Sequence, residues 1–571
     1  MNPLRILAII FLFAINATLA QPLSGNYTID SGTPTGGTNF QSFTDFATSI
    51  NTNGIAAAVV ATIVANSGPY NEQVVFDNIS GTSAANTVTI EGNGETIYAA
   101  VDSAKRHLIR LKNCEYFNIN NLNFVRDTAS TYIAFYGVHI LSTGQNISVS
   151  NCNFDIKSTT STLAGGIVAS GSETSLLSSG TFHNMQFMNN TSVGGGYGVS
   201  VFGNVNDLST NIVIDGNYFN DIFSNCVYLR ETNGAIVSNN HFDKTSSLAI
   251  GTNYIQIAQA ANVNAQIFGN YMQVSATNNG TQRIRGIYLF DGTGHRVYNN
   301  VIHHVHLLNG GFTGIEIRTA GTAPEISYNT ISIDTTAPST GLIYGIKEEL
   351  SNTNAILQNN VISMTQPCST KAALFISSIS NVTTTFNSNF NDFYVTNGGD
   401  VAYKNSSTPV YYNTLGDWQS ASGQDANSVS VSPDFISFSA PIPTNAALDN
   451  TGIVIPGITT DILGTPRAVN PDMGAYEFTS TGIHSIKYQN QLTSYPNPVT
   501  TELNVIIPGG GNTTINMNIV DVTGRTIIKS YNNINLNNGL CTVNTAELRE
   551  GIYFVKITAG SEQYHTSFIK K

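Results

Sequence analysis

The chain has 571 residues, of which only 11% are charged, and its formal net charge is −12. Average soluble domains carry roughly 25% charged residues, and nucleic-acid binding needs basic side chains that neutralise phosphates. With 24 Lys and Arg against 36 Asp and Glu, the composition argues against a nucleic-acid partner.

Residues 1–20 have the pattern of a secretory signal peptide. Arg5 precedes the apolar run Ile6 to Ile15, and Thr18-Leu19-Ala20 provides the small-residue end. No later segment approaches 18 uninterrupted apolar residues, so we expect no transmembrane segment.

The five cysteines lack metal-ligand spacing and are expected to be buried free thiols.

A short helix is predicted over residues 39–50. One helical face would carry Phe40, Phe43, Phe46, Ala47 and Ile50, with Ser42 and Asp45 placed for a capping box. Because the open end of a β-structure has unpaired edges, this helix is expected to cover the first coil of the fold described next.

One sequence phrase returns about every 30 residues: an apolar residue, a middle residue three positions later, and another apolar residue five positions later. Six copies carry Asn in the middle: Asn217, Asn240, Asn270, Asn300, Asn329 and Asn360. Earlier copies carry Leu122, Cys152 and Met185 there, and Phe386/Asn389 is a degenerate last copy. A fixed period without helical spacing predicts an all-β solenoid, a parallel β-helix of stacked coils. Asn both donates and accepts hydrogen bonds, so we expect these six residues to form an internal structural ladder.

A second phrase, out of phase with the first, is a small residue followed by an apolar residue, any residue, an apolar residue and any residue. Its copies start at Gly137, Gly166, Gly198, Cys226, Tyr254, Gly286, Gly314 and Gly345. The apolar members are expected to face the core, which predicts two outward rows of side chains because strand residues alternate between faces. The first row is His139, Val168, Ser200, Tyr228, Gln256, Tyr288, Glu316 and Lys347. The second row is Leu141, Ser170, Phe202, Arg230, Ala258, Phe290, Arg318 and Glu349.

The later parts of these rows form the candidate ligand-binding surface. It consists of Tyr288, Phe290, Glu316, Arg318, Lys347 and Glu349, which stacking places within roughly 10 to 15 Å. Aromatic rings offer flat faces to sugars, and Arg and Lys hold carboxylates. Glu316, Arg318 and Lys347 are the catalytic candidates, since a crowded side chain can act as a base. The alternative is a solvated sheet face whose charges alternate to avoid repulsion.

Metal and cofactor signals are weak. His303, His304 and His306 cluster at a turn, but no carboxylate is fixed beside them, and a surface turn is the favoured interpretation. We therefore predict no metal site and no cofactor, and leave calcium open.

Residues 401–478 do not continue the repeat pattern. They contain "LGDWQSASGQDANSVSVSPDFI" and "DILGTPRAVNPDMGAYEF". This stretch resembles the closing coils of bacterial right-handed parallel β-helix proteins of the pectate-lyase-like class. With the repeats, the resemblance covers residues 21–478. Arg467, Asp472 and Glu477 are expected to form an ion-pair clasp over the last coil.

After a linker over residues 479–487, residues 488–571 contain short alternating strands that predict a small β-sandwich. Its landmarks are Tyr495-Pro496-Asn497-Pro498, Gly524-Arg525, Gly551-Ile552-Tyr553 and a terminal Lys pair. This order closely resembles the type A C-terminal sorting domain of the type IX secretion system of Bacteroidetes. The resemblance implies a partnership with that machinery, export across the outer membrane, and release or attachment at the cell surface.

Two functional hypotheses remain open from the sequence. The first is a secreted or cell-surface protein that binds extracellular carbohydrate, either a polysaccharide or a cell-surface glycan. The alternative is a polysaccharide-cleaving enzyme, most plausibly a lyase acting on polyuronates. Fold does not decide between them, but the negative net charge disfavours polyuronate binding outside a locally basic groove.

Overall fold

The computed structural model describes residues 21–571 except for short gaps. These gaps are residues 130–131, 158–160, 247–252, 259–261, 279–282, 319–322, 351–352, 481–491, 496, 507–513, 522–525, 537–539 and 560–561. The predicted signal peptide lies outside the described residues. The chain divides into two compact units, with the boundary between Gly482 and Ile483. Neither helix in the described part of the chain has the length and apolar character needed to cross a membrane.

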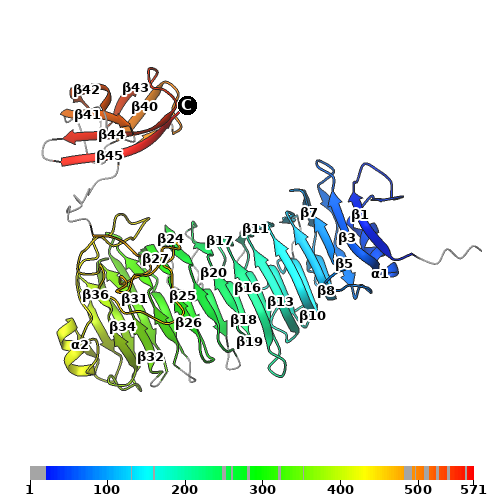
Figure 1. The fold of residues 1–571 in the computed structure, drawn as a ribbon, viewed down its shortest axis with the longest axis horizontal. Helices are drawn as coiled ribbons and strands as arrows, with labels where there is room; N and C mark the ends of the chain where they lie inside the picture. Colours follow the sequence, from blue (N-terminus) through cyan, green and yellow to red (C-terminus); the bar gives the residue numbers. More distant parts are fainter. Residues whose placement is uncertain are drawn as a thin grey trace, which may run out of the picture. The chain divides into compact units, whose positions relative to one another are not determined.

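The first unit is a parallel β-helix whose coils present three faces, which we call A, B and C in the order in which the chain passes through them within a typical coil, such as β5 (Val74–Asp77), β6 (Val88–Glu91) and β7 (Thr96–Ala99) (Figure 1). Face A contains β5 (Val74–Asp77), β8 (His107–Asn120), β10 (Tyr136–Ser150), β12 (Gly165–Ser170), β15 (Tyr197–Phe202), β18 (Asn225–Arg230), β22 (Asn253–Ala258), β25 (Ile284–Leu289), β28 (Phe312–Ile317), β31 (Ser339–Glu348), β34 (Cys368–Ile376) and β37 (Asp400–Lys404). The long strands β8 and β10 bend, so that their second halves belong to face B.

Face B is the side from which the chain turns toward the Asn ladder. Its other strands are β1 (Leu23–Ile29), β2 (Asn39–Phe40), β3 (Ile55–Ile63), β6 (Val88–Glu91), β13 (Thr181–Met188), β16 (Ser209–Asp215), β19 (Thr232–Asn233), β20 (Ile236–Ser238), β23 (Gln266–Phe268), β26 (Arg296–Tyr298), β29 (Glu325–Ser327), β32 (Ala355–Gln358) and β35 (Phe386–Asn389).

Face C is a separate sheet with one short strand per coil, twelve of them in the described residues. They are β4 (Tyr70–Asn71), β7 (Thr96–Ala99), β9 (Asn123–Arg126), β11 (Asn153–Lys157), β14 (Thr191–Gly194), β17 (Tyr218–Asn220), β21 (His241–Asp243), β24 (Tyr271–Asn278), β27 (Val301–Leu307), β30 (Thr330–Ile333), β33 (Val361–Met364) and β36 (Asp392–Val395). The inward side chains of all three faces form one continuous apolar core, so the predicted all-β solenoid is confirmed.

Four of the five free cysteines are buried in this core, and the fifth, Cys541, is buried in the second unit.

Helix α1 (Phe43–Asn53) covers the first coil. The Ser42 hydroxyl accepts a hydrogen bond from the Asp45 N–H at 3.0 Å, which fixes the helix start. The helix begins later than the expected residue 39, because Asn39 and Phe40 pair with β1 as strand β2.

At the other end, β38 (Val410–Tyr412) pairs antiparallel with β37, and helix α2 (Leu415–Ser422) follows. The buried Trp418 donates from Nε1 to Asp425 at 2.8 Å. Ser428 then accepts the N–H of Asn391, the last ladder residue, through its hydroxyl. This segment therefore terminates the ladder.

The Asn residues stack between faces B and C. The Oδ1 of Asn300 accepts both the backbone N–H and the side-chain amide of Asn270, at 3.2 and 2.9 Å, and the same double contact repeats along the stack. The ladder includes two residues that the sequence phrase missed, Asn190 and Asn391. Strand pairing places Phe187 beside Ile214, so Asn190 rather than Met185 occupies the middle position of its coil. Likewise, Asn391 rather than Asn389 occupies the last position.

The residue before each ladder position has a left-handed backbone. These residues are Asn121, Asn151, Asn189, Gly216, Asn239, Gly269, Asn299, Tyr328, Asn359 and Phe390, with φ between 52° and 68°. Gly and Asn tolerate this region better than other residues. The requirement explains why Asn-Asn and Gly-Asn pairs recur in the repeat.

Residues 430–478, which we call the strap, do not add coils but run back over the corner between faces B and C. Asn299 donates to the Thr460 carbonyl at 2.8 Å, Tyr328 to the Ile453 carbonyl at 2.7 Å, and Asn359 to the same Ile453 carbonyl at 2.6 Å. All three side chains belong to the left-handed residues before ladder positions. The strap is therefore held by successive coils through the same structural position.

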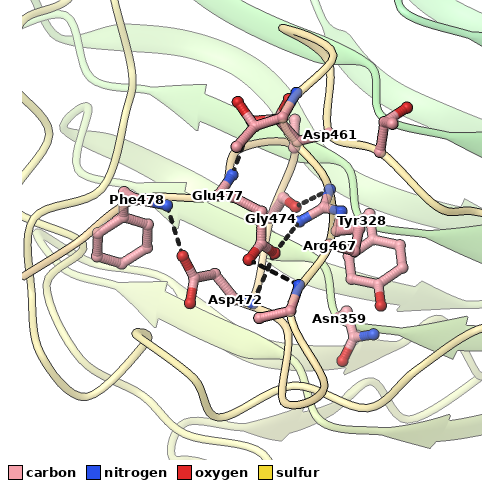
Figure 2. A network of polar contacts seen from close by, with 12 residues as sticks. Tyr328, Asn359, Asp461, Arg467, Asp472, Gly474, Glu477 and Phe478 are labelled. Carbon is pink, nitrogen blue, oxygen red and sulfur yellow. Dashed lines mark hydrogen bonds and ion pairs between the residues drawn. The ribbon is translucent and has the colours of Figure 1, made fainter.

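A polar network inside the strap surrounds Arg467 (Figure 2). Its guanidinium pairs with Glu477 at 2.9 Å, donates to Asn299 Oδ1 at 2.8 Å and lies 3.9 Å from the ring centroid of Tyr328. Asp472 accepts the Phe478 N–H at 2.6 Å. The expected clasp thus lies over coils well before the last one, because the strap folds backward.

The second unit is a small sandwich of two antiparallel sheets with its own core. One sheet contains β39 (Thr493–Tyr495), β40 (Glu502–Ile506) and β43 (Leu540–Asn544), and the other contains β41 (Thr514–Asp521), β42 (Thr526–Asn535), β44 (Gly551–Ala559) and β45 (Glu562–Lys570). Asn497 accepts the Ile569 N–H through Oδ1 at 2.8 Å, which ties this sequence landmark to the last strand. Pro496, Gly524 and Arg525 lie outside the described residues.

We predict that Asn300→Ala lowers the free energy of unfolding by about 1–3 kcal/mol, because two donors of Asn270 lose their buried acceptor. Urea denaturation of the purified protein measures this change. Asn26→Ala, at an exposed position of β1, is the matched control and should unfold like the parent. An Asn300→Ala protein with the parental midpoint would contradict a stabilising role for the ladder.

We also predict that Arg467→Ala releases the strap, because removing one partner of a buried ion pair costs roughly 3–5 kcal/mol. Hydrogen exchange should become faster in residues 450–478 while the amides of the ladder remain protected. Arg296→Ala is the control, since Arg296 also touches the strap, at Pro456, but its pair with Glu325 is more exposed, at 28% and 23%, and should contribute less. Equal effects of the two substitutions would refute the assigned role of Arg467.

Candidate functional site

The candidate site lies on the outer surface of face A, on strands β25, β28 and β31. Tyr288, Glu316 and Lys347 occupy the same register position on these three consecutive strands. They are therefore neighbours along one row, as the repeat spacing predicts. Phe290, Arg318 and Glu349 follow two residues later in each coil.

Glu316 is the centre of this cluster and is completely buried. Its carboxylate lies 3.0 Å from Arg285 Nε, 3.5 Å from Arg283 Nη1 and 3.6 Å from Lys347 Nζ. Lys347, whose side chain is only 5% exposed, also pairs with Glu349. Three cations thus converge on one carboxylate, which holds their side chains in place.

Cation and ring pairs form the outer part of the cluster. The guanidinium of Arg285 lies 4.6 Å from the ring centroid of Tyr288, and that of Arg318 lies 4.7 Å from the ring of Phe290. The two rings meet edge to face, with centroids 5.5 Å apart. Such stacking orients each guanidinium. In Arg285, Nε pairs with Glu316 and Nη1 donates to Asn253 at 3.3 Å, so Nη2 is the nitrogen left to meet a ligand.

The charges shift the acid–base behaviour of the surrounding groups. Burial raises the pKa of Tyr288, although hydrogen bonding to Arg318 opposes this effect. Burial would also raise the pKa of Glu349, but the ion pair with Lys347 and the nearby Arg285 outweigh it, so the pKa is lowered. Glu349 is therefore ionised at neutral pH.

Burial separates the predicted residues into two groups. Tyr288, Glu316 and Lys347 are buried and inaccessible to a large ligand, whereas the Arg285 side chain is 24% exposed and Arg318 and Phe290 are partly exposed. The catalytic candidates Glu316 and Lys347 form a buried ion pair with each other on face A. The accessible part of the cluster consists of planar cations and ring surface.

The sequence rows did not include Arg283 or Arg285. Strict alternation places Arg285 inward, like Ile287, but the strand starts at a corner where Gly286 and Ile287 both face the interior. A Cβ on Gly286 would lie 2.6 Å from the Gly314 carbonyl oxygen, so the corner has no room for a side chain. The break in alternation turns Arg285 outward, and the recurring Gly of the second phrase was the signal for it.

In the described residues, no group of three or more His, Cys, Asp or Glu side chains is arranged to hold a metal ion. His304 and His306 stack on each other with ring centroids 4.3 Å apart. His303 instead makes a 2.9 Å hydrogen bond with the Phe438 carbonyl of the strap.

Comparison with known proteins identifies the second unit. Residues 493–571 match the family described as "Secretion system C-terminal sorting domain". No curated protein matches the chain. Among solved structures, the native GH136 lacto-N-biosidase from Eubacterium ramulus is similar, with 14% identity over 67% of each chain and a TM-score of 0.37. Its selenomethionine derivative gives 13% identity over the same shares and a TM-score of 0.36. This degree of likeness carries no inference about activity.

The C-terminal unit is thus a sorting domain, and the protein is exported to be secreted or attached to the cell surface. The solenoid acts outside the cell. Its function must therefore be sought among extracellular ligands.

We predict that deleting residues 483–571 leaves a folded solenoid, because its core and closing segments lie within the first unit. The truncated protein should keep the parental solenoid melting transition but accumulate in the periplasm of the native host. Cell fractionation measures this, with Arg285→Ala in the full chain as the control that should be exported normally. Normal appearance of the truncated protein outside the cell would contradict the sorting role.

Proposed function

We propose that the solenoid binds an extracellular polysaccharide or cell-surface glycan that carries acidic groups. The observation that supports this most directly is the pair of partly exposed guanidinium groups, Arg285 and Arg318, stacked on Tyr288 and Phe290. A planar fork of donors recognises a carboxylate or sulfate, and the partly exposed ring of Phe290 can pack against sugar C–H surfaces. This combination suits an acidic sugar chain.

Local charge supports the same proposal. The cluster contains four cations, Arg283, Arg285, Arg318 and Lys347, against two carboxylates, an excess of two positive charges in a chain whose net charge is −12. An isolated basic patch on an acidic molecule concentrates anionic ligands at that patch. Binding is accordingly expected to weaken as ionic strength rises.

Recognition is favoured over cleavage because of Lys347. A lyase needs an accessible neutral base to remove a proton beside the uronate carboxylate. Lys347 is enclosed in ion pairs with Glu316 and Glu349, and its side chain is only 5% exposed, so it does not offer an accessible base. Membership of the pectate-lyase-like class and an origin in Bacteroidetes form part of this proposal on the sequence resemblance, and an N-terminal signal peptide does so on the pattern of residues 1–20.

We predict that the full chain binds polyuronates or sulfated polysaccharides, and that Arg285→Ala with Arg318→Ala weakens binding by at least roughly a hundredfold. Each charge-assisted hydrogen bond contributes roughly 1.5–3 kcal/mol, so losing both is measurable by calorimetry. The single Arg318→Ala variant, at a more exposed position, separates lost binding from lost folding.

The matched control is Arg296→Ala, because Arg296 also stacks on a Tyr, at 5.5 Å from the Tyr298 ring, but on face B. It should bind like the parent. Unchanged affinity in the double variant, or no binding by the parent across the acidic panel, would overturn the proposal. An increase in ultraviolet absorbance during incubation, abolished by Lys347→Ala, would instead support the lyase alternative.

A further inference from the structure

A second cluster of titratable residues lies on face A in the early coils. It comprises His107 and Arg110 of β8, and Tyr136 and His139 of β10, which pair in register as His107 with Tyr136 and Arg110 with His139. All four residues are more than nine-tenths buried. The row of His139 lies six strands from that of Glu316, or about 29 Å at 4.8 Å per strand. The two clusters are therefore separate.

The segment Gly171–Gly180 covers this second cluster. Its Leu176 packs on the side chains of Tyr136 and Tyr197. Its Glu173 places a carboxylate oxygen 3.4 Å from Arg110 Nη1, and the Glu173 side chain is 55% exposed. The cluster is thus enclosed between the sheet and one short segment.

Several buried nitrogen atoms of the cluster have no hydrogen-bond partner among the described residues. These atoms are both ring nitrogens of His107, Nε and Nη2 of Arg110, and Nδ1 of His139. The other ring nitrogen of His139 meets the Ser170 hydroxyl at 3.1 Å. Each buried, unpaired polar atom costs roughly 1–3 kcal/mol, and more when charged, so folded proteins leave few of them. Their concentration here points to a missing ligand.

The chemistry of these atoms defines the ligand. Arg110 supplies only donors, and each neutral imidazole supplies one donor. Arg110 is a fixed positive charge, which disfavours a metal ion. The carboxylate of Glu173 pairs with only one nitrogen atom of the Arg110 guanidinium, Nη1. A partner must therefore accept several hydrogen bonds and carry negative charge.

We propose that His107, Arg110 and His139 form a binding site for a small oxyanion, enclosed by the segment Gly171–Gly180. Sulfate, phosphate and a carboxylate share the required chemistry. The ion can be free in solution or be an acidic group at the end of a glycan.

The surroundings of this site also determine the protonation state of its two histidines. Burial and the charge of Arg110 lower the pKa of His107 to about 3 and that of His139 well below its usual value. Both rings are therefore neutral without a ligand. The groups that act on His107 are Arg110, Lys105 and Asp102, and Glu173 acts on Arg110.

Inorganic sulfate is the probe for the test, compared with sodium chloride at equal ionic strength. We expect sulfate, but not chloride, to raise the melting temperature of the full chain in a saturable way, because a ligand that binds only the folded state stabilises it. Crystals soaked in selenate should show an anomalous peak between Arg110 and His139. Competition by a sulfated or uronate oligosaccharide would assign the ion to a glycan end group, whereas its failure to compete would assign a free anion.

Two variants act in opposite directions. Arg110→Met should weaken sulfate binding at least tenfold, whereas Glu173→Gln should strengthen it severalfold, because the competing carboxylate is removed from Arg110. Glu173 is half-exposed, so this second variant tests the proposal even if Arg110→Met fails to fold. Arg230→Met is the control, since Arg230 lies on face A, stacked 4.2 Å from the ring of Phe202, and outside the cluster.

The absence of a saturable sulfate effect, or an unchanged affinity in Glu173→Gln, would overturn the proposal. So would a selenate peak located elsewhere. In these cases ordered water, rather than an anion, satisfies the buried nitrogen atoms.

Discussion

The turn between faces B and C is the constraint on which the rest of the solenoid depends. Each turn needs a residue with a left-handed backbone followed by a residue whose side chain fits between the neighbouring coils. Asn meets the second requirement, because its amide oxygen can accept two hydrogen bonds from one neighbouring coil while its amide nitrogen donates to another. The ladder and the apolar core therefore require the same register. A coil that shifted by one residue would lose its ladder hydrogen bonds and turn its apolar side chains outward. The ladder therefore fixes the register of faces A and B as well.

The residues with left-handed backbone in the same turns also hold the strap. At Asn299, Tyr328 and Asn359 the side chains point away from the core and bind the strap. A left-handed Tyr is unfavourable by itself, and the stacking of Arg467 on the Tyr328 ring, together with the Tyr328 hydroxyl bond to Ile453, compensates for it. The strap and the turn thus stabilise each other. The regular spacing of the coils makes this possible, because an extended segment can meet one equivalent residue in each coil.

Much of the fold could be predicted from the sequence, because the Asn repeat expresses a local requirement that every coil must meet. The rows on face A could be predicted for the same reason, and Tyr288, Glu316 and Lys347 do lie side by side. The burial of Glu316 could not be predicted, because it results from Arg283 and Arg285, which lie beyond the point where strand alternation breaks. The path of the strap could not be predicted either. It has no repeat of its own, and its contacts with Asn299 join residues more than 160 positions apart.

Glu316 shows how recognition and stability are connected on face A. Three cations beside one another would repel and adopt many side-chain conformations if the row contained only Arg and Lys. A buried carboxylate among them offsets the repulsion and restricts Arg283 and Arg285 to a narrow range of orientations, at the cost of burying charge. Glu316 is therefore a positioning residue, which touches the cations rather than a ligand. The accessible guanidinium of Arg285 is consequently oriented before any ligand arrives, and pre-organisation of this kind lowers the entropy lost on binding.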